Sequence, residues 1–594
     1  MNKLIYIKYL WLMLPLLAVF GCNDNEFLTE KPKTFYTTSN AFSSSDQVDQ
    51  VIVGCYSYVR YMYNLVGQND PWLAFKGANG TDLIDVPTIR RANRFNDYGI
   101  ITPTHTVFNT VYTAFYQLVE RANLAIYAAD LPQIIWSSQA DKTYALAQAR
   151  FFRAFAYRNL GELFGGVPIV KEIVTSPRYD FERTTRVQTY QFAIDELEAI
   201  LNDLPVTTSL KGRLTKGAAQ HLLCQLYLDK GLANEADGTD PKAAYQKAID
   251  NGNAVIDGGT YSLMTSRFGS RATQNPDYYF ANTTATQTAD RLYSKAGYPI
   301  TANVYWDLFQ EGNQDYQAGN KEAIWSTQVN YTAYKTEDKE SFLPYSRVFG
   351  GVFRDPASAI ATGTLEDVGG RGIAQAIPNF YTRDIIYADK WGTDMRNSEA
   401  VFRRIFLGNV STNTTYYGKV IPWSVLYKDG QTKDAIDAAK TQIYPVSCKI
   451  ATDKYTGVAD GENMSNLFRG EYIFRLSETI LLRAEAKMRM NDLSGAANDI
   501  NIVRRRATCS YLVTPSDVNV DLILDERARE LVYEETRWNT LLRMGGTIAI
   551  DRIKKYSYWD DPRNTLTSKF NLWPIPQLVI DTNKDKPMAQ NPGW

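Results

Sequence analysis

The sequence predicts a mainly α-helical fold with few, short strands, and three observations indicate it. Long stretches repeat apolar residues at intervals of three and four, which is the period of an amphipathic helix. Several of these stretches stop at turn residues such as Gly165-Gly166 and Asn491-Asp492. Neighbouring stretches combine small and large apolar residues at a repeat length that suggests tetratricopeptide-like helix hairpins.

Composition places the chain among ordinary globular proteins. Of its 594 residues, 44% are hydrophobic and 22% are charged. The net charge is −1, from 64 basic and 65 acidic residues, so nothing suggests a nucleic-acid partner. Aromatic residues reach 13%, including 39 Tyr and 11 Trp. Aromatic rings suit stacking on sugars as well as burial in a core.

The first 21 residues are typical of an export signal. Lys3 and Lys8 precede an apolar segment, Tyr9–Phe20, that is too short to span a bilayer comfortably. The following VFGC sequence resembles a bacterial lipobox and predicts that Cys22 becomes the lipid-bearing N-terminus. The alternative is an ordinary signal peptide with an incidental cysteine. Residues 22–44 are then a lipidated tether, and the mature protein is anchored to a membrane without crossing it.

Helices alternate with one loop region in the first part of the mature chain. A helix is expected from Ser45 to about Asn64, because Val48, Ile52 and Val59 share one face. Residues 65–110 are rich in Gly, Asn, Asp and Pro and predict a loop region. Further helices are expected over residues 111–129, 146–164, 183–204, 215–228 and 241–255.

A long interruption separates two helical blocks, at about 146–257 and 471–544. Residues 258–470 are dense in Tyr, Gly, Asn and Thr and predict loops, short helices and a few small strands. Long loops of this kind are usually functional. The second block is expected to hold three helices. Its first has a stripe from Ile473 to Met488, its second contains Ala496 and Val503, and its third runs from about Leu522 to Leu542.

Three glutamates in the last helix are four residues apart and need positive charges nearby. Glu526, Glu530 and Glu534 would repel one another on one helix face. We interpret them as part of an arginine–carboxylate network, because arginine pairs carboxylates through two hydrogen bonds. The alternative is a catalytic carboxylate pair of the glycosidase type. The available cations are Arg504, Arg505, Arg506, Arg527, Arg529 and Arg537.

Motifs for other catalytic chemistry are missing from the sequence. The only histidines are His105 and His221, which rules out an HExxH zinc site and disfavours a serine–histidine triad. There is no nucleophile elbow, P-loop or dinucleotide-binding glycine motif. The cysteines after Cys22 are scattered without metal or disulfide spacing. We therefore expect no cofactor and no metal site.

Several motifs in order resemble one known family. RLSETILLRAEA, NDINIVRRRA and ERARELVYEETRWNTLLRMG are similar to the C-terminal signature of the SusD/RagB family, the surface-exposed nutrient-binding lipoproteins of Bacteroidetes. The ending LWPIPQLVIDTNKDKPMAQNPGW also resembles that family, as does the stretch QARFFRAFAYRNLGELFGGVPIV. The resemblance implies one SusD-like domain over residues 45–594, with tetratricopeptide-like hairpins and a loop-rich, ligand-facing region.

The resemblance also implies function and partners. It implies a non-catalytic protein that captures an oligosaccharide and passes it to a SusC-like TonB-dependent transporter. The implied location is the outer membrane, lipid-anchored and facing the cell exterior. Some relatives favour peptides, so a peptide ligand is one alternative. A surface glycoside hydrolase on a helical scaffold is the other, since a carboxylate-only enzyme needs no histidine.

Candidate ligand contacts come from the resemblance and from the aromatic residues of the loops. TDLIDVPTIR resembles a family stretch whose acidic and arginine positions help to hold the sugar in the starch-binding branch, which implies roles for Asp82 and Arg90. In that branch, aromatic rings from the variable region stack on the ligand. The aromatic candidates are Trp72, Tyr98, Tyr293 and Trp306.

Overall fold

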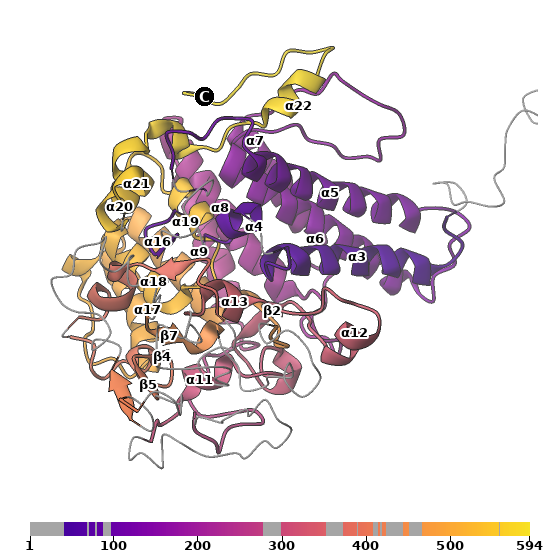
Figure 1. The fold of residues 1–594 in the computed structure, drawn as a ribbon. Coiled ribbons are helices and arrows are strands. Elements are labelled where there is room, and N and C mark those ends of the chain that lie inside the picture. Colours follow the sequence, from indigo (N-terminus) through magenta and orange to yellow (C-terminus); the bar gives the residue numbers. More distant parts are fainter. Residues whose placement is uncertain are drawn as a thin grey trace, which may run out of the picture.

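Helices from both ends of the chain lie together, and the loop-rich middle part lies at the bottom of the view (Figure 1). The computed structural model describes residues 41–67, 70–77, 80–86, 95, 97–276, 299–351, 372–388, 390–407, 414–415, 419–422, 444–450, 466–557 and 559–594. Cys22, Arg90 and Tyr293 lie outside these residues, so the predicted lipid site and two of the predicted ligand contacts have no structural description.

The helices of the first half pack in sequence order. Helix α5 lies against α6, α6 against α7, and α8 against α9, as the predicted hairpins require. Helix α6 is central, because all its side chains from Phe151 to Phe164 are buried. The bounds are α3 Ser45–Tyr63, α4 Asp70–Phe75, α5 Thr106–Ala129, α6 Gln139–Phe164, α7 Arg186–Ile200, α8 Lys216–Ala236 and α9 Lys242–Ile256.

Local signals explain where these helices begin and how closely they pack. At the start of α7, Gln188 N donates to Thr185 Oγ1 (3.1 Å) and Thr185 N donates to Gln188 Oε1 (2.9 Å), which forms a capping box. Gly231 of α8 faces the ring of Tyr245 on α9, where an added Cβ would lie 2.3 Å from that ring. The glycine therefore lets the two helices of this hairpin approach closely.

Short elements make up the described stretches of the middle part, as predicted. The α-helices in these stretches are α11 Val304–Leu308, α12 Tyr331–Thr336 and α13 Tyr345–Phe349. Within the described residues, the strands pair in twos and antiparallel, as β1 with β3, β2 with β8, β4 with β7 and β5 with β6. They are β1 Ile84–Asp85, β2 Ala323–Ser326, β3 Ile377–Pro378, β4 Phe402–Arg403, β5 Ile405–Leu407, β6 Val420–Pro422, β7 Val446–Ser447 and β8 Tyr472–Arg475.

The β2–β8 pair fastens the middle part to the helices. Leu476 N, at the start of α16, donates to the carbonyl oxygen of Glu322 (2.9 Å) just before β2. Trp325 of β2 then meets five rings edge-on, three of them at centroid distances of 5.4 to 5.5 Å. The middle part thus shares the main core and is not a separate unit. The three nearest rings belong to Phe151, Phe155 and Phe474.

The second helical block differs from the prediction at two points. The expected first helix begins with strand β8, so Ile473 lies in a strand and only the residues from Leu476 onward are helical. The expected third helix is two helices, because Tyr533 has a left-handed φ of 68° that ends the first of them. The helices are α16 Leu476–Arg489, α17 Leu493–Arg506, α18 Val520–Leu531, α19 Arg537–Arg543, α20 Ile548–Tyr556, α21 Asp560–Thr565 and α22 Gln577–Thr582.

The C-terminal segment closes one end of α6. Trp573 is fully buried, and its backbone N–H donates to the carbonyl oxygen of Leu163 (2.7 Å). Asn591 Nδ2 donates to the carbonyl oxygens of Phe164 (2.9 Å) and Trp573 (2.7 Å). Arg183 Nη2 in turn donates to Asn591 Oδ1 (2.6 Å). Within the described ranges, no helix is both long enough and apolar enough to span a bilayer.

Candidate functional site

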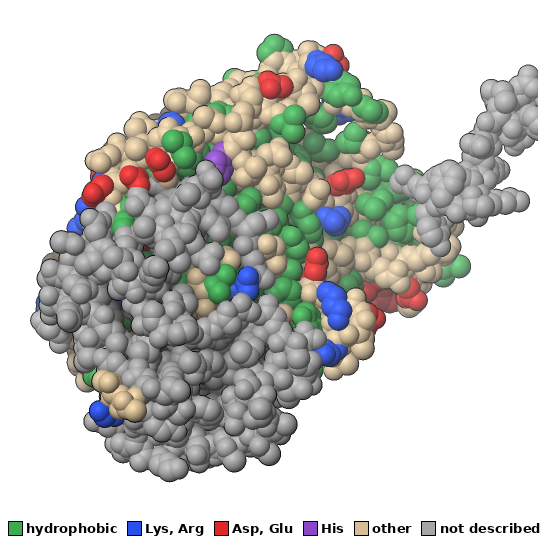
Figure 2. Space-filling view, viewed as in Figure 1, with side chains coloured by type: hydrophobic (Ala, Val, Ile, Leu, Met, Phe, Trp, Pro, Cys, Tyr) green, Lys and Arg blue, Asp and Glu red, His purple; other side chains and the backbone are tan. Residues whose placement is uncertain are grey.

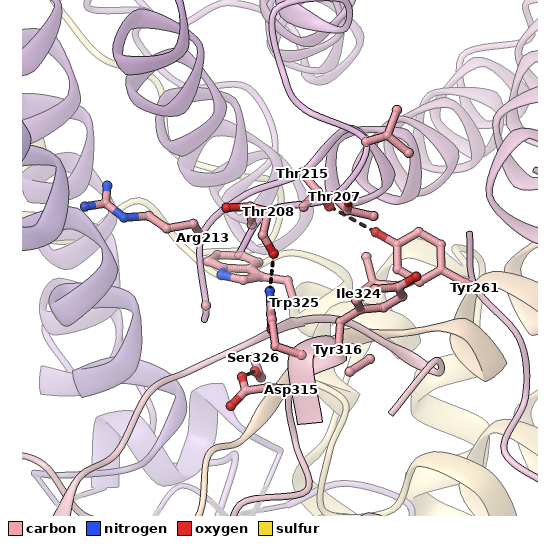
Figure 3. Close-up of a pocket in the computed structure, with 14 residues that line it drawn as sticks. Thr207, Thr208, Arg213, Thr215, Tyr261, Asp315, Tyr316, Ile324, Trp325 and Ser326 are labelled. Atoms are coloured by element: carbon pink, nitrogen blue, oxygen red, sulfur yellow. Dashed lines mark hydrogen bonds between the residues drawn. The ribbon is translucent and has the colours of Figure 1, made fainter. Parts of the chain in front are cut away.

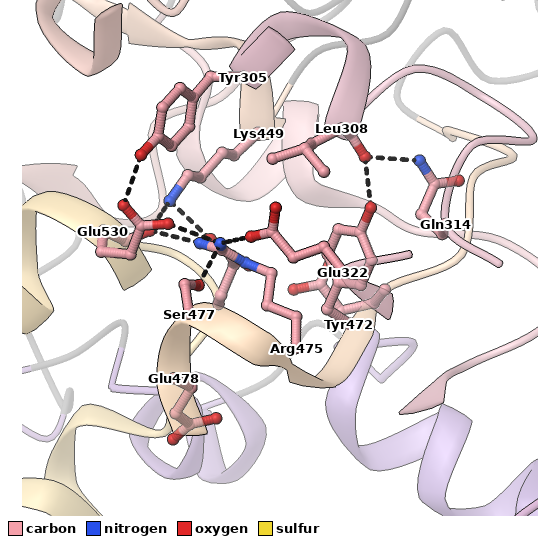
Figure 4. A network of polar contacts seen from close by, with 12 residues as sticks. Tyr305, Leu308, Gln314, Glu322, Lys449, Tyr472, Arg475, Ser477, Glu478 and Glu530 are labelled. Atoms are coloured by element: carbon pink, nitrogen blue, oxygen red, sulfur yellow. Dashed lines mark hydrogen bonds and ion pairs between the residues drawn. The ribbon is translucent and has the colours of Figure 1, made fainter. Parts of the chain in front are cut away.

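The predicted glutamates lie in a buried cluster of charges, which Figure 4 shows in part. Glu530 of α18 is at its centre and is fully buried. Its carboxylate accepts hydrogen bonds from Arg475 Nη1 (2.6 Å) and Arg506 Nη2 (2.6 Å). It also accepts from Arg396 Nη1 (3.1 Å) and from the hydroxyl group of Tyr305 (2.9 Å). We call this the charge cluster; its other members are Glu322, Lys449, Arg504, Glu526, Arg529 and Glu534.

Each further carboxylate of the charge cluster also has cationic partners. Glu526 Oε2 accepts from Arg504 Nε (2.9 Å) and from Arg529 Nε (3.1 Å). Glu534 binds Lys449 Nζ and Arg475 Nε, both at 2.6 Å. Glu534 comes after α18 ends, so only Glu526 and Glu530 share a helix face, which corrects the prediction of three on one face.

The cations keep these carboxylates ionised. Burial raises the pKa of Glu526, but nearby Arg529, Arg396 and Arg504 outweigh it and lower that pKa to about 2. The pKa of Glu530 is also lowered, because its arginines outweigh the effect of burial. A glycosidase needs one carboxyl group that keeps its proton, within reach of a sugar. The charge cluster offers neither a protonated carboxyl group nor access for a sugar. The interpretation of these glutamates as part of an arginine–carboxylate network is therefore confirmed.

Glu162 and Asp307 have raised pKa values, as a general acid would, but both side chains lie in the interior. Burial raises the pKa of Glu162 to about 7. Its oxygens accept from Arg158 Nη2 (2.5 Å) and Asn539 Nδ2 (2.7 Å), and its side chain is fully buried. Among the described residues, no group of three or more His, Cys, Asp or Glu side chains is placed to hold a metal ion.

Asp82, a predicted ligand contact, is a buried structural anion. Its carboxylate binds Arg537 Nε (2.8 Å) and Nη2 (2.7 Å) and also Arg552 Nε (2.8 Å). Burial raises its pKa, whereas Arg537 and Arg552 together lower it to about 2. The sequence match at TDLIDVPTIR is therefore not evidence of an exposed acid, because both carboxylate oxygens already have partners inside the protein.

The described aromatic candidates are also interior side chains. Tyr98 is fully buried and donates its hydroxyl proton to the carbonyl oxygen of Gly80. Trp72 is 4% exposed and meets the ring of Tyr61 edge-on at 5.7 Å. Trp306 is 2% exposed, with the guanidinium group of Arg271 4.3 Å from its ring centroid. None of the three rings has a face that is free for a sugar. Their burial therefore disagrees with the prediction that they contact the ligand directly.

The cavity in Figure 3 lies beside β2 and is too small for a sugar. At its base, the carboxylate of Asp315 accepts from Ser326 Oγ (3.0 Å) and Gln328 Nε2 (2.7 Å). Its free volume is about 30 Å³, which is room for about two water molecules. Figure 3 also shows the guanidinium group of Arg213 pointing away from the cavity. We therefore assign it no ligand.

A groove along α3 is larger, with a free volume of about 190 Å³. Each cation of its lining has an acidic partner. Arg60 Nη2 lies 2.6 Å from Asp338, Arg213 Nη2 lies 2.7 Å from Asp49, and Lys211 Nζ lies 3.8 Å from Asp315. These pairs cancel the positive charge of the groove, so it has no feature that selects an anionic ligand.

A third concave region was not predicted from the sequence. It lies beneath the loop of residues 168–184, where Figure 2 shows a hollow at the upper right. The exposed aromatic residue of this loop is Tyr179, which is 42% exposed. The signal that could have found it is the segment SPRYDFER, where aromatic and charged residues alternate between two helices.

The fold and the sequence match known proteins. Residues 277–594, more than half of the chain, match the SusD family. The chain belongs to the SusD family. Residues 26–228 match a family described as starch-binding and associating with the outer membrane. SusD family proteins are binding proteins without catalytic activity, and this chain is accordingly not an enzyme.

Individual relatives are distant in sequence. SusD-like protein P2 of Formosa agariphila is 23% identical over 600 residues, which cover 98% of each chain. A SusD-like protein of Bacteroides ovatus is 23% identical over 256 residues, and the match spans 43% of that protein. These SusD-like sequences agree with the family match.

Solved structures share the fold. A SusD homolog from Bacteroides thetaiotaomicron has a TM-score of 0.65 at 17% identity and covers 94% of this chain and 98% of its own. Surface glycan-binding protein A of the same organism, solved in complex with laminarihexaose, has a TM-score of 0.59 at 18% identity. That match covers 92% of this chain and 99% of the other. The predicted mainly helical, single SusD-like fold is confirmed.

Proposed function

We propose that this SusD family protein captures oligosaccharides at the cell surface and delivers them to a SusC-like TonB-dependent transporter in the outer membrane. The observation that carries the proposal is membership in a family of non-catalytic binding proteins. A relative of the same fold was solved with laminarihexaose, which supports a glycan as the ligand class. The charge cluster agrees with binding without turnover, because its carboxylates are buried and paired.

The proposed location is the outer face of the outer membrane. The lipobox-like sequence ending at Cys22 supports a lipid anchor, and the family match at residues 26–228 supports association with the outer membrane. A lipid on Cys22 would hold the protein beside its transporter while residues 23–44 act as a tether.

The proposed ligand contacts are Arg90 and Tyr293. Both follow from the family resemblance, and both lie outside the described residues. Asp82 and Tyr98 then have a supporting role, because they fix the chain on either side of Arg90 from within the core. Trp306 similarly anchors the chain after Tyr293 through its contact with Arg271.

The test is a binding screen with product analysis. The mature protein from Asn23 onward is run by affinity electrophoresis through gels that contain different polysaccharides. Retardation by at least one glycan, without release of shorter sugars, is the expected result. Released products would contradict a binding protein. Binding to casein peptides, with no retardation in any glycan, would make this a peptide-binding member of the family.

Variants then test the two contacts. Arg90→Ala and Tyr293→Ala should each weaken binding to the retarding glycan while the circular dichroism spectrum stays unchanged. Tyr127→Ala is the control, because this tyrosine is 37% exposed on α5 and has no proposed role. Wild-type affinity in both folded variants would remove Arg90 and Tyr293 from the proposed site.

A further inference from the structure

A pocket of about 240 Å³ lies between α5, the loop of residues 168–184 and the C-terminal segment with α22. This free volume is close to the lower end of the roughly 300–1,000 Å³ that small-molecule pockets usually have. Most of its surface is apolar. We call it the tyrosine pocket; its principal lining residues are Tyr112, Tyr116, Tyr179, Phe181, Val579 and Met588.

Hydrogen bonds hold the loop open over this pocket. On one side, Asn123 Nδ2 of α5 donates to the carbonyl oxygens of Val170 and Glu172, both at 3.1 Å. On the other side, Asn583 pairs with the backbone of Phe181, accepting from its N–H and donating to its carbonyl oxygen, both at 2.9 Å. A preformed pocket of this kind spends little binding energy on ordering its walls.

The α5 wall of the pocket is equally fixed. Tyr116 donates its hydroxyl proton to the carbonyl oxygen of Pro168 (2.6 Å), and its ring lies 4.9 Å from that of Tyr112. Tyr179 is different, because its side chain is 42% exposed while its carbonyl oxygen accepts from the N–H of Asp585 (2.9 Å). The backbone holds Tyr179 in place. Lys584 Nζ lies 5.7 Å from the centroid of its ring, and the exposed part of the ring is within reach of a ligand.

Polar groups stand at the rim of the pocket. Arg178 binds Asp180 through two hydrogen bonds of 2.9 and 3.2 Å, and both side chains are about half exposed, at 52% and 53%. The pair has no net charge but still offers an unused guanidinium nitrogen and carboxylate lone pairs. Such a rim fits a neutral ligand that carries hydroxyl groups.

Aromatic walls below a neutral, hydrogen-bonding rim match the two sides of a pyranose ring. A hexose presents C–H groups on its faces, which pack on aromatic rings, and hydroxyl groups around its edge. Next to the pocket lies a polar hollow of about 910 Å³, which shares Val170, Arg178 and Phe181 with it. The hollow provides room for sugar units that continue from a ring in the pocket.

We propose that the tyrosine pocket binds one neutral hexose unit of a glycan chain, with neighbouring units in the adjoining hollow. This inference rests on the proposed function and adds a second sugar site, made of residues other than Arg90 and Tyr293. Tyr179 would pack on the ring, and Arg178, whose guanidinium group lies 4.9 Å from the ring centroid of Phe181, would bind its hydroxyl groups together with Asp180. A chain held at two places dissociates more slowly than one held at a single place.

The experiment uses the mature protein and the polysaccharide that retards it most in the screen described above. Kd is measured by isothermal titration for wild type, Tyr179→Ala, Arg178→Ala and the control Tyr127→Ala. Tyr179→Ala is expected to raise Kd by about three- to tenfold, since one ring contact is lost. Tyr127→Ala should keep the wild-type Kd, because this tyrosine has similar exposure but lies outside the pocket.

The outcomes separate this inference from the proposed function. If wild type binds the polysaccharide and both Tyr179→Ala and Arg178→Ala bind it equally well, the pocket is not a sugar site, whereas the proposed function stands. If no glycan in the panel binds wild type, the proposed function fails and this inference fails with it. If casein peptides bind and Tyr179→Ala abolishes that binding, the pocket takes an apolar peptide side chain and the sugar assignment is wrong.

Discussion

Arg537 binds Asp82 through two parallel hydrogen bonds of 2.7 and 2.8 Å, across 455 residues of sequence. Both side chains are buried, at 2% and 0% exposure. The pair joins the chain next to β1 to the start of α19. A second arginine, Arg552 of α20, completes the coordination of the same carboxylate (2.8 Å). Asp82 thus fastens the first loop region to the C-terminal helices.

Replacing this carboxylate should destabilise the protein strongly. Asp82→Ala removes the fully buried anion that two buried guanidinium groups share, a change that costs roughly 3–5 kcal/mol of unfolding free energy. Asp521→Ala is the matched control, because Asp521 pairs with the same Arg552 (2.7 Å) but is 71% exposed. The control should cost no more than about 1 kcal/mol. Urea unfolding followed by circular dichroism measures both, and equal losses would contradict the structural role of Asp82.

The buried carboxylates should make stability fall in acid. Asp82 and Glu526 have folded pKa values of about 2, below the roughly 3.9 and 4.3 expected in the unfolded chain. A carboxyl group whose pKa is lower in the folded state stabilises the fold at pH values above its unfolded pKa. This stabilisation is lost as pH falls through its folded pKa. Each group contributes roughly 2–3 kcal/mol at pH 7, which should disappear between about pH 5 and pH 2.

Glu162 acts in the opposite direction. Because the pKa of Glu162 is raised to about 7, its contribution improves by roughly 2 kcal/mol as pH falls from 7 to 5, towards its unfolded pKa of roughly 4.3. The urea midpoint should therefore not fall between pH 7 and pH 5, and it should fall steeply below pH 5. A midpoint that is constant from pH 7 to pH 3 would show that the charge cluster is not ionised as described.

Two glycines in helices should respond in opposite ways to alanine. Gly231→Ala places a Cβ 2.3 Å from the ring of Tyr245, so overpacking should cost roughly 1–3 kcal/mol despite the better helix propensity of alanine. Gly54→Ala on α3 meets no atom within 4 Å and should stabilise by about 0.5–1 kcal/mol. Thermal unfolding of both variants checks the difference. Similar shifts would contradict the close packing of α8 on α9.

Cys22 is the predicted site of lipid attachment. Cys22→Ser removes the thiol that would carry the lipid, so the protein should move from the membrane fraction to the soluble fraction of lysed cells. Fractionation with an antibody measures this, with Cys55→Ser as the control, since Cys55 is buried in α3. Membrane retention of Cys22→Ser equal to wild type would contradict a lipid anchor.

Sequence patterns predicted helices well where one face of the helix packs against the core. The period of Val48, Ile52 and Val59 gave α3, and the glutamate spacing of α18 indicated the arginine network. The same period wrongly predicted one continuous helix across Tyr533. The sequence spacing of Leu531 and Leu542 fits a single helix, so it does not reveal the left-handed turn between them.

The site was harder to predict because its contacts are distant in sequence. Arg396 lies 134 residues from Glu530, so no local pattern could pair them. Asp82 looked like an exposed loop acid because its two arginines come more than 450 residues later. Arg527 and Arg537 were expected to pair with the glutamates of α18. Instead, both bind Glu535, and Arg537 also binds Asp82.

The closure of α6 by Asn591 has a consequence for how the chain matures. Synthesis proceeds from the N-terminus, so Phe164 is made more than 400 residues before the side chain that caps it. Until Trp573 and Asn591 arrive, the end of α6 exposes aromatic surface, and unfinished surfaces of this kind promote aggregation. A chain that lacks these last residues should therefore aggregate more readily than the full chain.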